Sequence, residues 1–469
     1  MLFRSHNTSG SLIRGLCGFL LALTVSAPLA SAQASRVGPT FLVNQYANGS
    51  GTQAKETDVA YDSVHGVYLE VWGFGIVYGR FVTGNGTVLG TGPFTIAGSA
   101  GYAACPRVAF SPDANEFMVI WQDNRITPPD IPHIFARLLS FQPSGDPTFQ
   151  GADFQVSQGF THPRSNPAIE YSTGSHVFMA VYQSGDMYGH RFDVTGAALG
   201  PEFKLTTDGS WYEQPDVAYN STNDEFFVTF AHWIDAWNAG LIQGRRVRAG
   251  TEELLTLVDV DSLSRSTYGP TAVSWDPVRN QYLVAFYRIV TAFTTYGRFI
   301  AANGTPASSQ FTIASTGTYV ANGAAYNPVS DTYFVVFPHH DIPEIYGAQV
   351  TGAGVVDPMI RVTTVLDSNP AVIGVDYPKV AAATDRPEWL ATANIWWSGA
   401  IGQRVTTNTV GTPASSRRCR RAMARWVRRA ASRCCGRRSL AAASTCAWTR
   451  STTTPATPRG SQSASRPPR

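Results

Sequence analysis

The sequence predicts an all-β fold, a seven-bladed β-propeller of four-stranded antiparallel blades, from three observations. A repeat of roughly fifty residues returns seven times along the chain. Inside each copy the apolar and aromatic segments are short, as strands are. The pattern of the fourth strand also stands once before the first copy, where it could close a ring. A repeat of this length that contains only strands is typical of propeller blades.

Each copy opens with an apolar, a small and an aromatic residue, which mark a short first strand. The openings are Val59-Ala60-Tyr61, Val108-Ala109-Phe110, Ile169-Glu170-Tyr171, Val217-Ala218-Tyr219, Val273-Ser274-Trp275, Ala324-Ala325-Tyr326 and the weaker Val380-Ala381-Ala382. A turn rich in Asp, Asn, Ser and Pro follows, as in Asp276-Pro277. In such a turn Pro sets the backbone angle, and the preceding polar side chain accepts a local hydrogen bond.

The second and third strands indicate how the blades pack. The second strand is apolar without polar alternation, as in residues 117–121 and 333–337, so both of its faces must be covered. Neighbouring blades would cover them. The third strand carries a Gly-Arg element, as in Tyr78-Gly79-Arg80. Because this element returns in most copies, we expect it to be structural, with Gly admitting an aromatic ring and Arg pairing at the blade edge.

Residues 41–44 (Phe-Leu-Val-Asn) precede the first copy and match the fourth-strand pattern, whereas the seventh copy loses the pattern after its third strand at 401–405. We therefore predict that the N-terminal strand completes the last blade and that the propeller spans residues 41–405. The repeat over residues 57–405 resembles the tandem blades of secreted bacterial β-propeller proteins, many of unassigned function. This resemblance rests on scaffold residues and implies no catalytic residue.

The N-terminus is predicted to be a signal peptide, residues 1–32. Arg4 and Arg14 form a basic leader, residues 16–25 an apolar run, and Ala30-Ser31-Ala32 a cleavage site. The prediction places the protein outside the cytoplasm, secreted or periplasmic, without a membrane span in the mature chain.

The C-terminal segment, residues 412–469, is predicted to be a disordered Arg-rich tail. Residues 417–469 contain 14 Arg and no Lys, Asp or Glu, so the +14 of this segment against the +3 of the whole chain leaves −11 for residues 1–416. The strand pattern stops abruptly near Thr412, which favours translation out of frame. Electrostatic binding of a polyanion is the alternative.

Ligand binding is expected on the face that carries the loops between second and third strands, because these loops vary most. Exposed aromatic rings would stack on sugars, with polar loop residues beside them. The ligand-binding residues predicted on this face are Trp233, Trp237, Trp396, Trp397, Asp123, Arg125, His339 and Asp341. The alternative is that the rings pack the loop stems onto the blades.

A second set of candidates belongs to the central channel. Asp58, Arg107, Asp216 and Lys379 each precede the opening triplet and would ring the channel mouth, where they could bind a polar ligand or simply be paired or hydrated. Glu70 and Glu170 replace small apolar residues, so either could be a general acid with a raised pKa or part of a salt bridge to a third-strand Arg.

Other chemistries have little support in the sequence. Five loop histidines (His133, His162, His232, His339 and His340) lack a metal-binding spacing, so no metal and no cofactor is expected. There is no nucleophile elbow and no phosphate-binding loop, and no nucleic acid is expected on the folded body.

The favoured hypothesis is a monomeric, non-catalytic propeller that binds a carbohydrate, a peptide or a surface polymer. A glycosidase or lyase acting in the channel and a structural or adhesive module are the alternatives, because a propeller can support any of these functions.

Overall fold

The protein folds as a seven-bladed β-propeller, seen in a computed structural model that describes residues 33–44, 56–98, 102–126, 131–159, 162–234, 240–261, 271–289, 293–315, 323–339, 342, 344–365, 375–395 and 399–407. Every element of the described residues is a β-strand, and none of them contains a helix that could span a membrane. The predicted signal peptide and the predicted tail lie outside the described residues.

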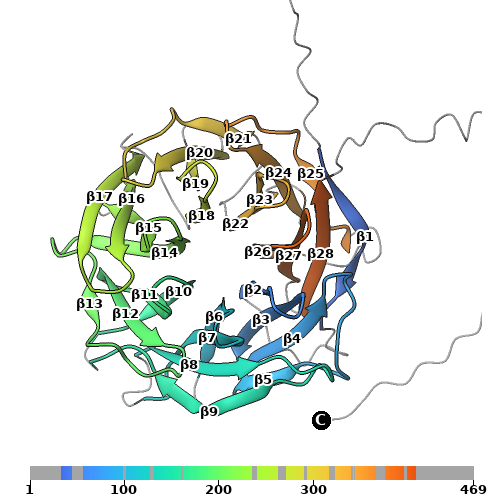
Figure 1. The fold of residues 1–469 in the computed structure, drawn as a ribbon, viewed down its shortest axis with the longest axis horizontal. Helices are drawn as coiled ribbons and strands as arrows, with labels where there is room; N and C mark the ends of the chain where they lie inside the picture. The colour runs from blue at the N-terminus through green and yellow to red at the C-terminus, as the bar shows by residue number, and fades with distance from the viewer. Residues whose placement is uncertain are drawn as a thin grey trace, which may run out of the picture. The chain divides into compact units, whose positions relative to one another are not determined.

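Six blades each take four consecutive strands, and the seventh takes its outer strand from the N-terminus (Figure 1). Blade 1 contains β2 (Glu56–Asp62), β3 (Val67–Gly75), β4 (Val77–Thr83) and β5 (Phe94–Ala97). Blade 2 contains β6 (Ala103–Ser111), β7 (Glu116–Asp123), β8 (His133–Ser140) and β9 (Thr148–Gln155). Blade 3 contains β10 (Ser165–Ser172), β11 (Val177–Ser184), β12 (Asp186–Asp193) and β13 (Phe203–Lys204).

Blade 4 contains β14 (Trp211–Asn220), β15 (Glu225–Trp233), β16 (Gly240–Arg248) and β17 (Leu254–Asp261). Blade 5 contains β18 (Ala272–Asp276), β19 (Gln281–Ile289), β20 (Phe293–Ala301) and β21 (Phe311–Ser315). Blade 6 contains β22 (Gly323–Asn327), β23 (Thr332–Pro338), β24 (Ile345–Thr351) and β25 (Ile360–Arg361). Blade 7 contains β26 (Val375–Ala382), β27 (Glu388–Ile395), β28 (Gly399–Thr407) and β1 (Ala34–Leu42), in which β1 pairs with β28.

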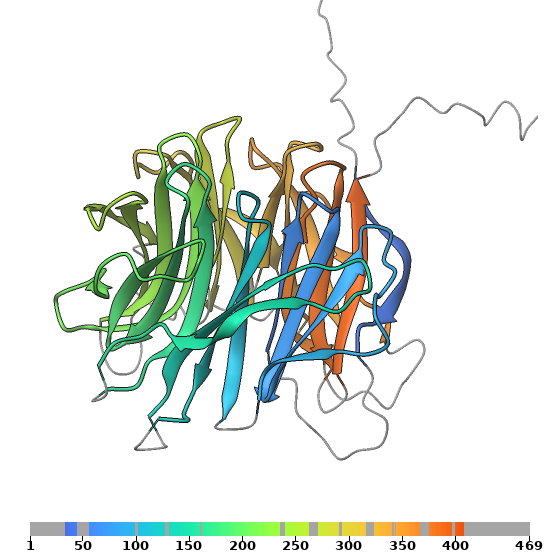
Figure 2. The ribbon, with the colours of Figure 1, turned by 60° about the horizontal axis from the view of Figure 1, so that its bottom comes forward.

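The first strands form the inner wall of the ring. Each packs beside the first strand of the next blade, and β26 packs beside β2, so the circle is complete (Figures 1 and 2). The second strands are enclosed between neighbouring blades, as their apolar sequences predicted. The core cluster between blades 7 and 1, for example, joins Tyr68 and Trp72 of β3 to Leu390 of β27.

The turns between first and second strands have the predicted chemistry. In six blades the first turn residue accepts backbone N–H groups two or three positions ahead, at 2.8 to 3.2 Å. These acceptors are Asp62, Ser111, Ser172, Asn220, Asp276 and Asn327. All six are fully buried, so the turns are fixed in position and register.

The Gly-Arg element of the third strand is structural, as expected. A Cβ on Gly79 would lie 2.6 Å from the Phe94 ring, and one on Gly402 would lie 2.6 Å from the Phe41 ring. The residue after the glycine position reaches the preceding blade. In blade 1, Arg80 donates from Nη1 to the carbonyl of Val43 at 2.7 Å, just after the outer strand of blade 7.

Four other blades repeat this contact between blades at 2.6 to 3.0 Å. The pairs are Arg137 with the Ile96 carbonyl, His190 with that of Val156, Arg245 with that of Leu205, and Arg298 with that of Val260. Each carbonyl lies at or just beyond the end of the preceding blade's fourth strand. The third strand of one blade therefore holds the outer edge of its neighbour.

The N-terminal strand closes the ring, which confirms the predicted closure. Strand β1 pairs with β28 from Ala34 opposite Thr407 to Leu42 opposite Ile401, and the Val43 N–H donates to the Ala400 carbonyl at 3.0 Å. The strand begins earlier than the 41–44 segment because the residues from Ala34 onward also find partners along β28.

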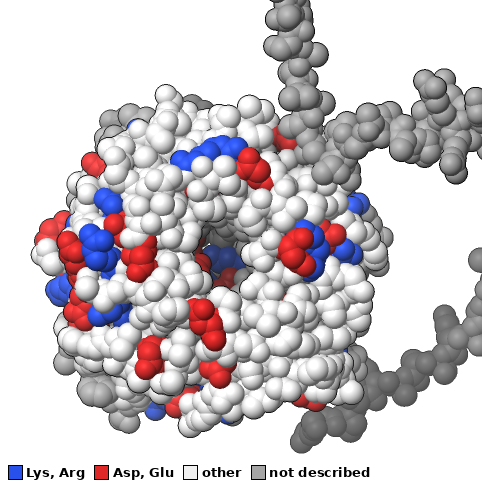
Figure 3. Space-filling view, viewed as in Figure 1, with Lys and Arg blue, Asp and Glu red and all other residues white. Residues whose placement is uncertain are grey.

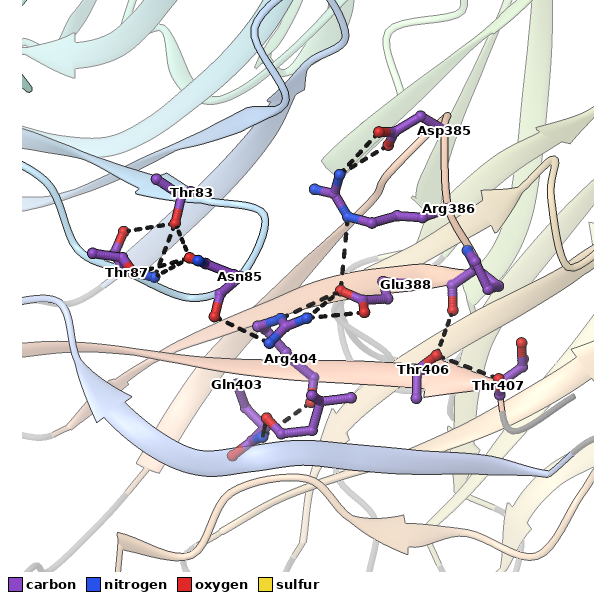
Figure 4. Close-up of polar contacts among 12 residues, drawn as sticks. Thr83, Asn85, Thr87, Asp385, Arg386, Glu388, Gln403, Arg404, Thr406 and Thr407 are labelled. Carbon is purple, nitrogen blue, oxygen red and sulfur yellow. Dashed lines mark hydrogen bonds and ion pairs between the residues drawn. The ribbon is translucent and has the colours of Figure 1, made fainter. Parts of the chain in front are cut away.

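Side chains on the turn side of blade 7 complete the joint to blade 1 (Figure 4). Arg404 of β28 donates to both carboxylate oxygens of Glu388 at 2.7 and 2.9 Å and to the Asn85 carbonyl of blade 1 at 3.0 Å. The Tyr61 hydroxyl donates to Asp385 at 2.6 Å. Backbone and side chains together hold the two ends of the ring.

The closure can be tested at Val43. Val43→Pro removes the N–H that bonds Ala400 and should lower the free energy of unfolding by about 3 kcal/mol. Val43→Ala keeps this N–H and should cost less. Chemical denaturation of both variants measures the difference, and a wild-type stability for Val43→Pro would place the closure elsewhere.

Candidate functional site

The two faces of the ring differ in what they expose. We call the face where the first strands begin the loop face, and the face of the turns between first and second strands the turn face. Among the described residues, the large apolar side chains exposed in turns of the turn face are Val64, Val278, Val329 and Val355. The exposed aromatic ones are Tyr102, Trp211 and Tyr377, all at the start of first strands. Among the described residues, the exposed aromatic rings therefore lie at the loop-face ends of blades 2, 4 and 7.

Blade 4 presents the largest aromatic surface. Trp211 is 57% exposed and stands directly opposite Trp233 in the β14–β15 pair, so the two side chains leave the same side of the sheet. Trp211 donates from Nε1 to Glu213 at 2.6 Å, which fixes the ring. Ile234, the residue after Trp233, is 54% exposed. Trp233 thus lies at the loop-face end of blade 4 and is partly buried, whereas Trp211 opposite it is the exposed ring.

The first strands are kinked at the loop-face end. In four blades a residue in a left-handed conformation precedes a proline, and the pairing with the second strand shifts there. These residues are Cys105, Asn166, Gln214 and Tyr377, with φ from 49° to 53°. Such bulges re-aim side chains and are frequent beside functional sites. Here they set the direction of the residues that follow, which line the channel.

The channel carries the charged residues predicted for it, and Figure 3 shows charged side chains in a hollow at the centre of the ring. Asp58 accepts the Val108 N–H of the next blade at 2.9 Å, and Asp216 accepts the Val273 N–H in the same way. Arg107 binds Glu56 at 2.7 Å. The two aspartates therefore hold neighbouring first strands together in addition to facing the channel.

The four predicted channel residues act on one another electrostatically although they come from blades 1, 2, 4 and 7. Burial raises the pKa of Asp58 and of Asp216, and the charges of Lys379 and Arg107 oppose that rise at both carboxyl groups. All four side chains are partly accessible to solvent. The channel therefore brings together the four residues that the sequence placed at its mouth.

Glu170 of β10 joins this group. Burial raises its pKa to about 7, with Asp216 and Asp58 adding to the rise and the Tyr171 N–H opposing it. Its Oε1 accepts that N–H at 2.8 Å. Glu170 therefore lies within electrostatic reach of two acids from other blades. We define the channel cluster as Asp58, Arg107, Glu170, Asp216 and Lys379.

Glu70 lies elsewhere, fully buried beside the interface of blades 7 and 1. The suggested salt bridge to a third-strand Arg is absent among the described residues: Arg80 stands opposite Glu70, but its donors bind the carbonyls of Val43, Leu89 and Gly90. Neither Glu70 oxygen has a hydrogen-bond partner there, and burial raises the pKa of this carboxyl well above its ordinary value. Burial in the core therefore favours the uncharged form of the Glu70 carboxyl.

Other predicted loop-face residues have structural roles in the part of the chain that is described. Asp123 is fully buried and accepts from Trp121 Nε1 at 3.0 Å and from Arg125 Nη2 at 2.6 Å. Arg125 also binds Asp153 at 2.5 Å, and its guanidinium lies 4.5 Å from the centre of the Phe135 ring. These contacts tie strand ends of blade 2 together, so we remove both residues from the binding surface.

The remaining predicted residues give a mixed picture. His339 packs against the Tyr346 ring with 4.8 Å between centroids. Trp237, Trp396, Trp397 and Asp341 lie outside the described residues. Among the residues that are described, no three His, Cys, Asp or Glu side chains are grouped to hold a metal ion, and His133 is buried at the start of β8.

Sequence reasoning missed Tyr102 and Tyr377 as exposed loop-face residues. A signal was available, because Tyr102 and Trp211 stand at the same distance before their opening aromatics, Phe110 and Tyr219, and each is followed by a proline four residues later. Tyr377 immediately precedes Pro378. Exposure itself was not predictable, since it depends on how neighbouring blades cover the strand ends.

Comparison with known proteins finds only distant structural likenesses. No family model and no curated protein matches the chain. Among solved structures, the Dos1 propeller matches with 9% identity and a TM-score of 0.44, covering 78% of this chain and 94% of that one. The propeller domain of the Trilobed protease from Pyrococcus furiosus matches with 9% identity and a TM-score of 0.42, covering 79% and 99%. The Hadza microbial sialidase Hz136 matches with 8% identity and a TM-score of 0.45, covering 71% and 73%. Likeness at this level carries no argument about activity.

Replacing Glu70 should stabilise the protein. Glu70→Val places the residue found at this position in blades 2, 4, 5 and 6 and removes a buried unpartnered acid, so the free energy of unfolding should rise by about 1–3 kcal/mol. Because the folded-state pKa of Glu70 is raised, the native protein holds a proton that the unfolded chain releases above about pH 4.5.

Wild-type stability should therefore fall as the pH rises from that value, and this contribution should vanish in Glu70→Val. Glu70→Gln, which stays polar, should remove the pH dependence without the full gain. Denaturation at several pH values measures all three proteins, and a destabilised Glu70→Val would show that the carboxyl has a stabilising partner.

Proposed function

We propose that this protein is a non-catalytic binding propeller that recognises a carbohydrate on its loop face. One observation carries the proposal: the exposed aromatic side chains of the described residues gather at the loop-face ends of the first strands. Aromatic rings with a polar group are suited to ligands that have both apolar faces and hydroxyl groups. The predicted signal peptide would place such a surface outside the cytoplasm, where glycans and surface polymers are abundant.

Trp211 is the centre of the proposed surface. Its ring is more exposed than that of any other large aromatic side chain of the described residues, and the hydrogen bond from Nε1 to Glu213 holds it without covering its face. A ring that is already ordered loses little conformational freedom when a ligand stacks on it. Trp233, directly opposite, widens the platform.

The state of the channel carboxylates favours binding over catalysis. Asp58 and Asp216 each accept a backbone N–H of the next blade, so both are used to join first strands. A base or nucleophile that also holds the scaffold would disturb the ring whenever it changed its bonding. Binding on the loop face requires no such change.

A glycan array screened with the purified protein, followed by titration of the strongest ligand, tests the proposal. Trp211→Ala should weaken binding by about tenfold or more, because a central Trp contact is commonly worth this much. Stability should change by less than about 0.5 kcal/mol, since the ring is largely exposed. Val278→Ala, an exposed apolar residue of the turn face, is the matched control and should bind as wild type. Equal binding by the Trp211→Ala protein would remove the loop face from the site.

A hydrolase acting in the channel is the second candidate, favoured by Glu170. A carboxyl with a pKa of about 7 is suited to general acid catalysis at neutral pH, and Asp58 and Asp216 lie within electrostatic reach. Aryl glycosides of several sugars, assayed with wild type and Glu170→Gln, test it. Turnover that the substitution reduces at least about a hundredfold would support this candidate. Equal rates for the two proteins would reject it.

A further inference from the structure

The exposed tryptophan of blade 4 is coupled to a carboxylate of its own strand. Trp211 and Glu213 stand two residues apart in β14, so their side chains leave the same side of the sheet as that of Trp233, which lies opposite Trp211. Trp211 donates from Nε1 to Glu213 Oε1 at 2.6 Å. Because an indole N–H lies in the plane of its ring, the carboxylate lies at the edge of the ring, and this contact covers neither face. We call Trp211, Glu213 and Trp233 the blade 4 platform.

Glu213 keeps the capacity to bind a ligand. Its side chain is partly exposed. Its second oxygen, Oε2, makes no hydrogen bond with any residue that the structure describes, and the carboxylate makes no ion pair with any of them. An ionised carboxylate can accept about four hydrogen bonds, and Trp211 uses one of these. A hydroxyl group of a sugar that stacks on the Trp211 ring can therefore donate to Glu213.

The strand end that carries the platform is held in place by contacts with its neighbours. Tyr212, between the two coupled side chains, is buried and donates its N–H to the Gly185 carbonyl of blade 3 at 3.0 Å. Its ring stacks on His232 with 4.4 Å between centroids, and its hydroxyl donates to Asp208 at 2.9 Å. The indole and the carboxylate are therefore presented by a fixed backbone, and less conformational entropy is lost when a ligand binds.

The charge around the platform is negative. Residues 205–216 and 231–234 form the loop-face ends of β14 and β15 and the segment before β14, and they contain Asp208, Glu213 and Asp216 but no Lys or Arg. Lys204, directly before them, is paired with Asp186 at 2.7 Å. An anionic group placed on the platform would therefore be repelled by Glu213, and these residues supply no cation to offset the repulsion. An uncharged hydroxyl group meets no such repulsion.

We propose that Glu213 determines the specificity of the platform, so that the carbohydrate bound by this protein is a neutral sugar and not an acidic one. The inference rests on the proposed function, because it names the class of sugar that the loop face takes. The apolar face of a pyranose ring lies on Trp211, and a hydroxyl group of the same ring donates to Glu213. A hydrogen bond to a carboxylate is stronger than one between neutral groups, so the same residue attracts a hydroxyl and repels an acid.

The test compares tetrasaccharides of glucose, galactose and mannose with tetrasaccharides of the corresponding uronic acids by calorimetric titration. The members of each pair differ at C6, which carries a hydroxyl group in one and a carboxylate in the other. The tightest neutral sugar should bind at least about tenfold more tightly than its acidic counterpart. Its affinity should not change as salt is added, whereas the preference over the acidic sugar should shrink because salt screens the repulsion.

Two substitutions separate a specificity role of Glu213 from a structural one. Glu213→Gln keeps an oxygen for the Trp211 Nε1–H and removes the charge, so binding of the neutral sugar should weaken by about five- to tenfold while binding of the acidic sugar tightens. Trp211→Phe keeps a ring but removes the N–H that holds Glu213, and it should also reduce the preference. Asp146→Asn, an exposed acid on a turn of blade 2, is the matched control and should bind as wild type.

Four results would overturn the inference. Equal affinity for neutral and acidic sugars, or tighter binding of the acidic ones, would reject it and leave the carbohydrate proposal intact. A Glu213→Gln protein that weakens both classes by the same factor would show that Glu213 only supports the ring. An affinity for the neutral sugar that falls steeply with salt would contradict recognition of an uncharged group. No binding of any tetrasaccharide or of any glycan of the array would reject the inference and the proposed function together.

Discussion

The structure depends on the hydrogen bonds that cross from the third strand of one blade to the outer edge of the blade before it. Blades pack face to face through apolar side chains, and such packing alone does not fix how far one sheet slides along the next. Arg80, Arg137, His190, Arg245 and Arg298 each bind a carbonyl at the end of the preceding blade's fourth strand. Hydrogen bonds from guanidinium groups, which supply four of these five contacts, are among the stronger ones. These contacts therefore fix the outer edge of each of these blades to the next blade around the ring.

The non-covalent joint of the ring uses the same contacts as an internal one. At the joint of blades 7 and 1, Arg404 pairs with Glu388 and donates to the Asn85 carbonyl. At the joint of blades 4 and 5, Arg246 pairs with Glu225 and donates to the Asn303 carbonyl at 2.8 Å. The closure between blades 7 and 1 therefore uses the same kind of contact as two blades that are consecutive in the chain. The N-terminal strand, which pairs along β28, also removes an exposed sheet edge.

The two faces of the ring differ in how firmly their surfaces are held. The turn face is fixed by buried polar side chains in its turns, so little of its surface can adapt to a ligand. The loop face has strand ends with exposed aromatic rings and bulges that turn side chains toward the channel. The charged residues of the channel cluster line one channel only because the first strands of five blades are arranged around one axis. The rigid ring holds these side chains without direct ion pairs among them, and groups that are not paired with one another remain available to a ligand.

The sequence by itself determined the blades. Strand order, the Asx turns, the close contact at Gly79 and the ring-closing strand were all predictable, because each depends on neighbours along the chain or on a pattern repeated in every copy. It also marked Asp58, Arg107, Asp216 and Lys379 as equivalent residues. Only the tertiary structure decided their surroundings: Asp123 is buried against Trp121, Glu170 lies in the field of Asp58 and Asp216, and Glu70 lacks a partner. Burial and electrostatic environment are set by contacts between blades that are distant in sequence, and a single copy of the repeat does not specify which residues of the other copies it meets.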